Sequence, residues 1–284
     1  MLKTILSTFK PQAEKIIAEE QAELGAGRST TEQIFNLRIL CEKYLQHQQN
    51  FYHVFIDFID DRVWNAALWA TMKKYISTNL IQVIKNLYNK ATHAVLFNSS
   101  IGDCFRTTAG VRHGCLLSPT LFNIFLERIM ADTLEDHEGT VSIGGKTITN
   151  LRFADDTDGL AREDEELANL VQRLDKASTA YSMEISAEKT KLMTNNTSGI
   201  NTEIKVNGQK LETDTSFKYL GSVINDEGFK PKTLSRIAQT TAALTRLKPV
   251  WIDKSISLSS KIRLTRSLIT SIFLYACESW TLTA

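Results

Sequence analysis

The stretch LRFADDTDGL, residues 151–160, places two adjacent aspartates between two runs of strand-forming residues. The apolar residues on both sides of Asp155 and Asp156 predict a strand, a tight turn and a second strand. Two neighbouring carboxylates repel each other, so a turn that presents both is costly unless a positive charge lies beside it. A solvated turn is the ordinary explanation for an Asp-Asp pair, and it stays open on this stretch alone.

A divalent metal ion is the usual source of such a positive charge. Mg²⁺ binds a few carboxylate oxygens and keeps positions open for water and substrate phosphates. Two such ions about 3.5–4 Å apart can activate a hydroxyl and stabilise a leaving pyrophosphate. This arrangement needs a carboxylate from a second strand, and Asp57 in the strand-like run YHVFIDF is the candidate. Asp57 could equally cap the helix that follows, so the metal site is a hypothesis.

The rest of the chain predicts an α+β architecture. Helical periodicity covers residues 11–23, 30–46, 61–75, 79–88, 118–137 and 163–181, and two basic segments at about 233–248 and 257–276. Strands or hairpins are predicted at 52–58, 93–97, 140–149, 150–161 and 203–212, and a single strand at 217–224. Thr30 or Thr31 is expected to cap the second helix, and Ser118 the helix that continues with Pro119.

The net charge of +1 hides an uneven distribution of charge. Between residues 155 and 175, eight acidic residues stand against two arginines. From residue 229 to the last residue, two acidic residues stand against nine basic ones: Lys230, Lys232, Arg236, Arg246, Lys248, Lys254, Lys261, Arg263 and Arg266. This distribution is compatible with a cation-binding acidic site beside a basic lobe that binds a polyanion, or with two solvated helix faces.

Several classes of protein are not indicated. The four cysteines have no C-x-x-C spacing, which argues against a zinc site or a disulfide framework. No apolar run reaches the roughly 18 residues needed to span a bilayer, and the first residues do not read as a signal peptide. We therefore expect an intracellular protein, in the nucleus or the cytoplasm, that does not enter a membrane.

Five motifs in one order make the chain resemble the palm of reverse transcriptases, above all those of non-LTR (LINE-type) retrotransposons. The motifs are FIDF, GVRHGCLLSPTLFNIFLE, FADD, MEISAEKTKLM and FKYLGSVI. The resemblance implies a right-hand polymerase palm, an antiparallel sheet backed by helices, at residues 51–225. It also implies partial fingers at 1–50 and a truncated helical thumb at 226–284.

The resemblance also implies an activity and its residues. Asp57, Asp155 and Asp156 match the catalytic aspartates that hold two Mg²⁺ ions, for which Mn²⁺ can substitute, and Lys189 matches a lysine that assists proton transfer to the leaving pyrophosphate. The positions matching template- and nucleotide-binding residues are Arg28, Arg112, His113, Gly114, Ser118 and Pro119. Those matching the primer grip are Tyr219, Leu220 and Gly221. The implied partners are an RNA or DNA template, a DNA primer and deoxynucleoside triphosphates, with an endonuclease supplied from outside this chain.

The chain departs from the family pattern in its nucleotide pocket. The first motif usually runs F-x-D-F-x-K-A-F-D-x-V, and its second aromatic packs under the sugar. FIDFIDDRVW is two residues shorter, and Phe58 has the wrong spacing to replace that aromatic. His113 stands where glutamine is usual, and QAELGAGRST lacks the usual G-F-R. Both ends also look short, so we expect weak or absent polymerase activity.

Two other functions are compatible with parts of the sequence. A catalytically inactive retroelement remnant could bind nucleic acid through its basic thumb. A palm-fold nucleotide cyclase would share the carboxylates at strand ends, but GVRHGCLLSP and FKYLGS argue against it because a cyclase has no primer to hold.

Overall fold

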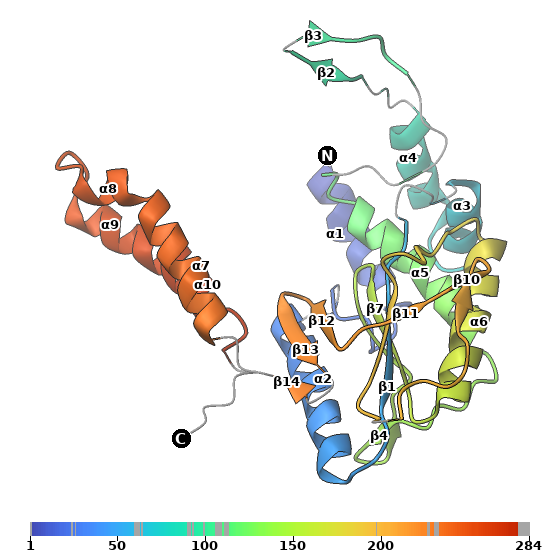
Figure 1. Cartoon of the computed structure of the whole chain (residues 1–284). Helices are drawn as coiled ribbons and strands as arrows, with labels where there is room; N and C mark the ends of the chain where they lie inside the picture. Colours follow the sequence, from blue (N-terminus) through green and yellow to red (C-terminus); the bar gives the residue numbers. More distant parts are fainter. Residues whose placement is uncertain are drawn as a thin grey trace. The chain divides into compact units, whose positions relative to one another are not determined.

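The computed structural model describes residues 2–23, 25, 27–59, 63, 65–89, 92, 94–98, 100–105, 110, 114–196, 198–225, 228–229 and 233–277 (Figure 1). The chain forms two compact units, each discontinuous in sequence. The first comprises Met1–Arg28 and Asn50–Asp214, and the second comprises Ser29–Gln49 and Thr215–Ala284. The division into fingers, palm and thumb made from the sequence stays a prediction.

A five-stranded sheet forms the centre of the first unit. Its strand order is β11 (Glu212–Thr213), β8 (Lys191–Thr194), β1 (Tyr52–Ile56), β7 (Asp156–Ala161) and β6 (Asn150–Phe153). All neighbouring pairs are antiparallel except β11 with β8. Every residue of β1 is buried, as expected for a central strand of aromatic and β-branched residues that is covered on both faces.

Helices α5 (Ser118–Leu134) and α6 (Asp164–Ala180) lie together against this sheet (Figure 1). Leu167, Leu170, Val171 and Leu174 of α6 are buried, and their three- and four-residue spacing makes one apolar stripe. Helices α1 (Leu2–Ala13), α3 (Asn65–Lys73) and α4 (Thr78–Asn89) add to the same unit. The predicted antiparallel sheet backed by helices is therefore confirmed.

Three short hairpins complete the first unit: β2 (Leu96–Phe97) with β3 (Ser100–Ile101), β4 (Ser142–Ile143) with β5 (Lys146–Thr147), and β9 (Lys205–Val206) with β10 (Gln209–Lys210). The last two turn at Gly144-Gly145 and Asn207-Gly208, and all four of these residues have positive φ. This is the conformation of the type I′ turn that both dipeptides favour, so both predicted hairpins are confirmed.

The second unit combines α2 (Thr30–Gln46) with a small sheet and the C-terminal helices. The sheet contains β12 (Ser216–Tyr219), β13 (Ser222–Asn225) and β14 (Gly228–Phe229), in that order. The helices are α7 (Thr233–Arg246), α8 (Lys248–Ile252), α9 (Leu258–Leu264), the π-helical turn η2 (Thr265–Ile269) and α10 (Thr270–Phe273). No helix in the described part of the chain is long and apolar enough to cross a membrane.

The helix predicted at residues 11–23 is wrong in its position. The helix α1 ends at Ala13, and the chain runs extended past Gln21 alongside β6. Ala22 N donates to Arg152 O, and Arg152 N donates to Glu20 O, both at 2.9 Å. Pairing with the free edge of β6 satisfies these backbone groups, and local periodicity cannot reveal a partner so distant in sequence.

Three smaller predictions also need correction. Residues 217–224 form two strands rather than one, because Leu220 and Gly221 turn the chain with φ of +46° and +82°. Ser29 caps α2 by accepting a hydrogen bond from Glu32 N at 3.2 Å, in place of Thr30 or Thr31. Ser118 is the first residue of α5 rather than its cap, and its hydroxyl lies 3.3 Å from the hydroxyl of Tyr88.

Candidate active site

The two adjacent aspartates lie at the turn between β6 and β7. Phe153 pairs with Asp156, so only Ala154 and Asp155 connect the strands. Ala154 has a φ of +57°, which is the conformation of the first central residue of a type II′ turn, where glycine is preferred. A positive φ costs a residue with a Cβ roughly 1–2 kcal/mol. The turn leaves Asp155 half-buried and Asp156 exposed.

Asp57 follows directly after β1 and lies at the same end of the strands as the β6–β7 turn. The antiparallel register pairs Ile56 with Thr157, so the next position along β1 faces Asp156. The backbone of Asp57 is held from a third segment: Ser186 N donates to Asp57 O at 2.9 Å, and Asp57 N donates to Thr190 Oγ1 at 3.3 Å. The structure thus brings all three predicted aspartates to the same end of neighbouring strands, the end of β1 and the β6–β7 turn.

Lys189 lies beside Asp57. Its Nζ is 3.3 Å from Asp57 Oδ1, and the side chains are 68% and 40% exposed. An ion pair this exposed contributes little to stability because water screens it. The pair nevertheless places the Lys189 ammonium at the strand ends that carry the predicted aspartates.

The described residues contain no group of three or more His, Cys, Asp or Glu side chains arranged closely enough to hold a metal ion. Asp57 pairs with the Lys189 ammonium, which supplies the positive charge there. Carboxylate oxygens are the ligands that Mg²⁺ prefers, and Asp57 and Asp156 occupy facing backbone positions. The donor types therefore suit a divalent cation, whereas the described side chains are not gathered around one, and the cation site stays a proposal.

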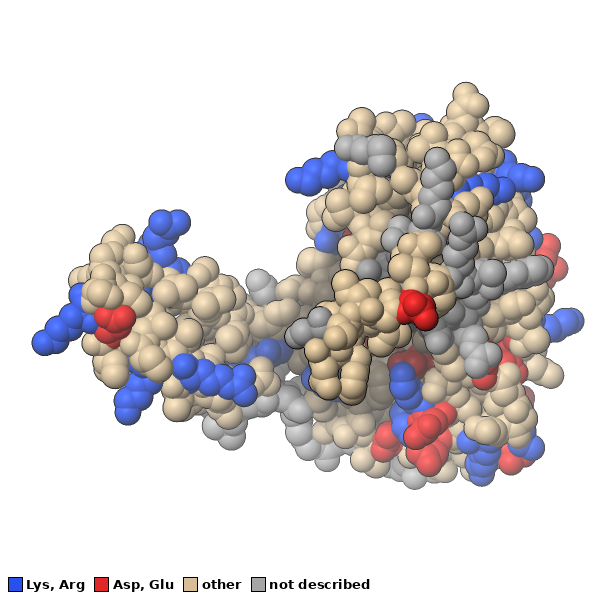
Figure 2. All heavy atoms as spheres, turned by 90° about the horizontal axis from the view of Figure 1, so that it is seen from above, with Lys and Arg blue, Asp and Glu red and all other residues tan. Residues whose placement is uncertain are grey.

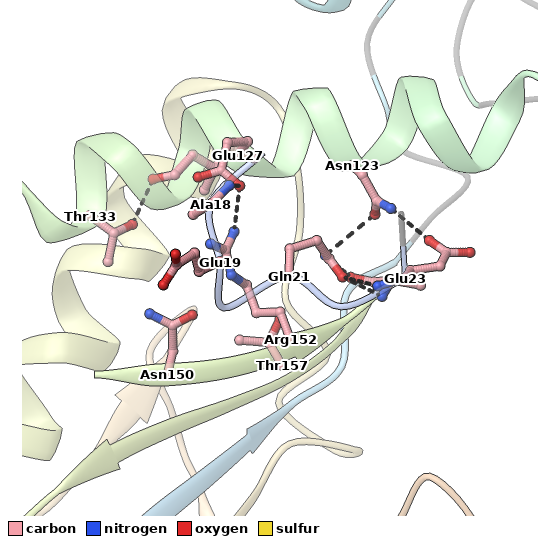
Figure 3. Close-up of polar contacts among 12 residues, drawn as sticks. Ala18, Glu19, Gln21, Glu23, Asn123, Glu127, Thr133, Asn150, Arg152 and Thr157 are labelled. Carbon is pink, nitrogen blue, oxygen red and sulfur yellow. Dashed lines mark hydrogen bonds and ion pairs between the residues drawn. The ribbon is translucent and has the colours of Figure 1, made fainter. Parts of the chain in front are cut away.

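A polar cluster that the sequence did not indicate lies behind the turn (Figure 3). Gln21 is fully buried and hydrogen-bonds the backbone of Ala154. Asn123 of α5 donates to Glu23 Oε2 at 2.6 Å. Burial raises the pKa of the Glu23 carboxyl, the Asn123 hydrogen bond opposes that shift, and the nearby Asp155 adds to it. An asparagine within the apolar run LFNIF was the one available sequence signal.

The third acid of the opening stretch, Asp158, points into the core. It is fully buried, and its Oδ2 lies 3.1 Å from Nδ1 of the buried His53 of β1. Burial raises the pKa of the Asp158 carboxyl, and the adjacent His53 opposes this shift. The His53 ring also contacts the rings of Phe51 and Phe55. Asp158 is therefore separate from the edge that carries the other aspartates.

The predicted template- and nucleotide-binding residues are only partly described. Arg112 and His113 lie outside the described residues. Gly114 has a φ of +75°, and Pro119 is exposed at the start of α5, whereas Ser118 is buried. Their roles stay predictions.

Arg28 is engaged inside the first unit. Its Nη1 donates to the backbone carbonyls of Glu19 and Gln21, the second at 3.2 Å. In this structure Arg28 therefore supports the extended segment next to β6. A contact with a nucleotide stays a prediction.

The predicted primer-grip residues form the turn between β12 and β13. Tyr219 is buried, while Leu220 and Gly221 are the two central residues, with the positive φ values of a type I′ turn. Two side chains from the C-terminal part of the chain hold the turn. Tyr275, which follows α10, donates through Oη to Leu220 O at 2.8 Å, and Arg236 of α7 donates through Nη2 to Gly221 O at 3.0 Å. The Arg236 guanidinium lies over the Tyr275 ring, 4.6 Å from its centroid.

An antiparallel sheet that is backed by two helices and carries carboxylates from a central strand and a neighbouring β-turn is the architecture of a polymerase palm. The sequence profile described as "Reverse transcriptase (RNA-dependent DNA polymerase)" matches residues 1–224. The chain therefore belongs to the reverse transcriptase family, and its enzyme class by family is RNA-directed DNA polymerase.

Relatives confirm the resemblance to reverse transcriptases of non-LTR retrotransposons. The chain is 22% identical over 283 residues to the RNA-directed DNA polymerase from mobile element jockey of Drosophila melanogaster, covering 95% of this chain and 30% of that protein. It is 23% identical over 293 residues to the probable RNA-directed DNA polymerase from transposon X-element of the same species, with the same two coverages. The chain thus spans about a third of the length of these relatives.

Solved structures support the fold alone. The apo telomerase from Candida tropicalis aligns with a TM-score of 0.60 at 15% identity, over 98% of this chain and 50% of that chain. A form of it truncated from the C-terminal domain aligns with a TM-score of 0.58 at 16% identity, over 81% of this chain and 44% of that chain. Both likenesses agree with the palm architecture.

Proposed function

We propose that this chain transfers deoxynucleotides to the 3′-hydroxyl of a DNA primer under the direction of an RNA or DNA template. The observation that supports this most strongly is the β1–β7 register, which puts Asp57 opposite Asp156 where the β6–β7 turn presents Asp155. Membership in the reverse transcriptase family supplies the reaction class.

In this proposal Asp57, Asp155 and Asp156 bind two divalent cations. When bound, such ions activate the primer hydroxyl and stabilise the leaving pyrophosphate. Lys189 donates a proton to that pyrophosphate, because its ammonium is already at the carboxylate edge, 3.3 Å from Asp57. The exposure of the lysine leaves it free to turn toward a substrate.

The nucleic acid would be held by groups of two kinds. Gly114 and Pro119, with Arg112, His113 and Ser118, form the proposed template and nucleotide contacts, and the Leu220–Gly221 turn holds the primer end. The C-terminal helices carry exposed basic side chains, which Figure 2 shows projecting from their surface. Phosphates attract such side chains without regard to base sequence.

The nucleotide pocket sets the expected rate. Phe58 is 3% exposed and pairs with Ile185, so its ring belongs to the core and does not replace the sugar-facing aromatic. Asp60–Arg62, where the first motif is shortened, lie outside the described residues. We expect slow incorporation, because displacements of about 1 Å near the reacting atoms can cost roughly a hundredfold in rate.

Primer extension on poly(rA)/oligo(dT) with Mg²⁺ or Mn²⁺ tests the proposal. Wild-type protein should add nucleotides, and Asp155→Asn should lower the rate at least about a hundredfold while binding the same template–primer, as measured by fluorescence anisotropy. Glu188→Gln, which removes an exposed carboxylate next to Lys189, is the matched control and should leave the rate unchanged.

Binding without extension by the wild type would contradict the proposal and identify a nucleic-acid-binding remnant. Incubation with ATP or GTP alone separates the cyclase alternative, for which pyrophosphate would be released without a template. We expect none.

A further inference from the structure

The Gln21 side chain holds the backbone of the Ala154–Asp155 turn, which lies 133 positions later in the sequence. Its Nε2 donates to Ala154 O at 3.0 Å, and Ala154 N donates to its Oε1 at 3.0 Å. One carboxamide thus satisfies both main-chain polar groups of one residue, as a neighbouring strand would. Gln21 is fully buried, so water does not compete with these bonds.

Ala154 is the residue of the turn that most needs such support. Its φ of +57° is a conformation that glycine adopts freely and alanine avoids. The alanine methyl group cannot compensate, because it makes no hydrogen bond. The two bonds from Gln21 favour this one conformation over relaxed alternatives.

The direction of the carboxamide is determined by its other neighbours. The amide nitrogen of Asn123 donates to Glu23 Oε2 at 2.6 Å. Asn123 Oδ1 therefore faces Gln21 Nε2, at 3.4 Å, and Glu23 N donates to Gln21 Oε1 at 3.3 Å. Figure 3 shows Gln21 and Asn123 directed toward each other. The donor end of Gln21 thus meets the carbonyl of Ala154, and the acceptor end meets its amide.

The backbone of Gln21 is tied to the same hairpin. The residues on either side of it, Glu20 and Ala22, both hydrogen-bond the backbone of Arg152, at 2.9 Å. Arg152 precedes Ala154 by two positions on β6. Because β6 fixes the position of Gln21, a displacement of the turn would lengthen the hydrogen bonds between the Gln21 side chain and Ala154.

We propose that Gln21 is a positioning residue that sets the conformation of the Ala154–Asp155 turn and thereby the placement of the Asp155 and Asp156 carboxylates. Asn123 and Glu23 orient its carboxamide. The consequence for catalysis rests on the proposed function, whereas the hold on the turn does not.

Gln21→Met tests the hold directly, because methionine keeps the length of the side chain and removes both hydrogen bonds. We expect hydrogen–deuterium exchange in a peptide spanning residues 150–157 to become about tenfold faster, the equivalent of one or two lost hydrogen bonds. Thr133→Val is the control: it removes the buried Thr133 Oγ1 bond to Ile129 O, 2.8 Å long, on the same helix as Asn123. That variant should leave exchange at the turn unchanged.

Binding and rescue give readouts that a loss of general stability would not move. Electron paramagnetic resonance of Mn²⁺ should show roughly 10–100-fold weaker binding to Gln21→Met, the usual cost of removing a partner that orients a ligand. Primer extension should lose kcat while the KM for template–primer is retained. Adding Ala154→Gly should restore much of both, because glycine takes the positive φ without support, so the two substitutions should be non-additive.

Unchanged exchange at residues 150–157 in Gln21→Met, or additive effects of Gln21→Met and Ala154→Gly, would overturn the proposal. Should Gln21→Met fail to fold, Gln21→Glu keeps the length and the acceptor, and it should still speed exchange. Faster exchange in a protein without polymerase activity would uphold the hold on the turn and reject the proposed function. Polymerase activity of the wild type together with unchanged exchange in Gln21→Met would support the proposed function and reject the role of Gln21.

Discussion

Lys189 is the proton donor of the proposed reaction. Its ammonium lies 3.3 Å from Asp57 Oδ1 and is largely in solvent. We predict that Lys189→Gln lowers the kcat of primer extension by roughly 10²–10⁴, the range for loss of a general acid. Single-nucleotide incorporation under saturating triphosphate measures this.

Glu188→Gln on the same segment is the control for Lys189→Gln and should have no effect. An unchanged kcat in Lys189→Gln, or a loss that appears only in the affinity for template–primer, would contradict the proton-transfer role.

The His53–Asp158 pair is a matter of stability rather than of catalysis. His53→Phe keeps an aromatic ring against Phe51 and Phe55 but leaves the Asp158 carboxyl buried without its histidine. We predict a decrease of about 1–3 kcal/mol in the free energy of unfolding, the cost of a buried polar group left without its partner, measured by urea denaturation.

The double variant His53→Phe with Asp158→Leu should recover much of this loss, because neither position then leaves a buried polar group without a partner. Equal stability of the single and double variants would show that the pair is not the cause.

At the scale of single residues, the sequence predicts which residues lie at strand ends better than it predicts which side chains contact one another. Asp57 and Asp155 are predicted to lie together because a two-metal site needs carboxylates from two strands, and because both match catalytic aspartates of the family. Asp158 stands in the same stretch, yet its burial depends on His53, which is distant in sequence. Gln21 gave no signal at all, since its partner Ala154 lies 133 positions away.

At the scale of elements, the β12–β13 hairpin shows how a side chain from a distant segment can stabilise a turn. Leu220 has a φ of +46° in a position that favours asparagine or glycine, and Tyr275 Oη donates to its carbonyl at 2.8 Å. We predict that Tyr275→Phe lowers stability by about 0.5–1.5 kcal/mol, measured by thermal unfolding.

Leu220→Asn, added to Tyr275→Phe, should restore part of this loss, because asparagine tolerates the positive φ. The same melting temperature for Tyr275→Phe and wild type would exclude a stabilising role for this bond.

Elements with their own periodicity or turn chemistry were predicted well, and elements defined by distant pairing were not. The helix at residues 30–46 and the Asn207-Gly208 hairpin appear as predicted. The segment around Gln21 is predicted as helix from its local periodicity. It is extended in the structure because it pairs with the edge strand β6, a partner that local periodicity does not reveal. The strand β8 pairs with β1 but is too short to show a clear alternation.

At the scale of the whole molecule, the α+β class is predicted by the local patterns of strands and helices, and the palm is implied by the resemblance of five motifs to those of reverse transcriptases. The strand order β11-β8-β1-β7-β6 did not follow from it. That order depends on which edges the flanking segments cover, and β11, with two residues, carries too little pattern to place. Each unit is built from two separate stretches of the chain, and this assembly is set by tertiary contacts that the sequence does not reveal.

The basic C-terminal lobe contains two kinds of basic residue, and the structure separates them. Arg246, Lys254 and Arg263 are exposed. Lys261 instead donates through Nζ to the carbonyls of Trp251 and Asp253, at 2.8 and 2.7 Å, so its charge serves the connection between α8 and α9. Counting charges along the sequence treats all four alike, whereas only the exposed residues are placed to contact phosphates.

We therefore predict that the triple variant Arg246→Gln, Lys254→Gln and Arg263→Gln weakens binding to template–primer and lowers its dependence on salt. Each lost phosphate contact reduces the slope of log K against log salt concentration by roughly 0.7–0.9, so three should reduce it by about 2 or more. Fluorescence anisotropy over a range of NaCl concentrations measures the slope. Lys261→Gln removes one positive charge and should leave the slope unchanged while lowering the melting temperature, whereas each single variant, Arg246→Gln, Lys254→Gln or Arg263→Gln, should lower the slope. A change of slope in Lys261→Gln as large as in one of those single variants would mean that net charge, rather than the exposed positions, governs binding.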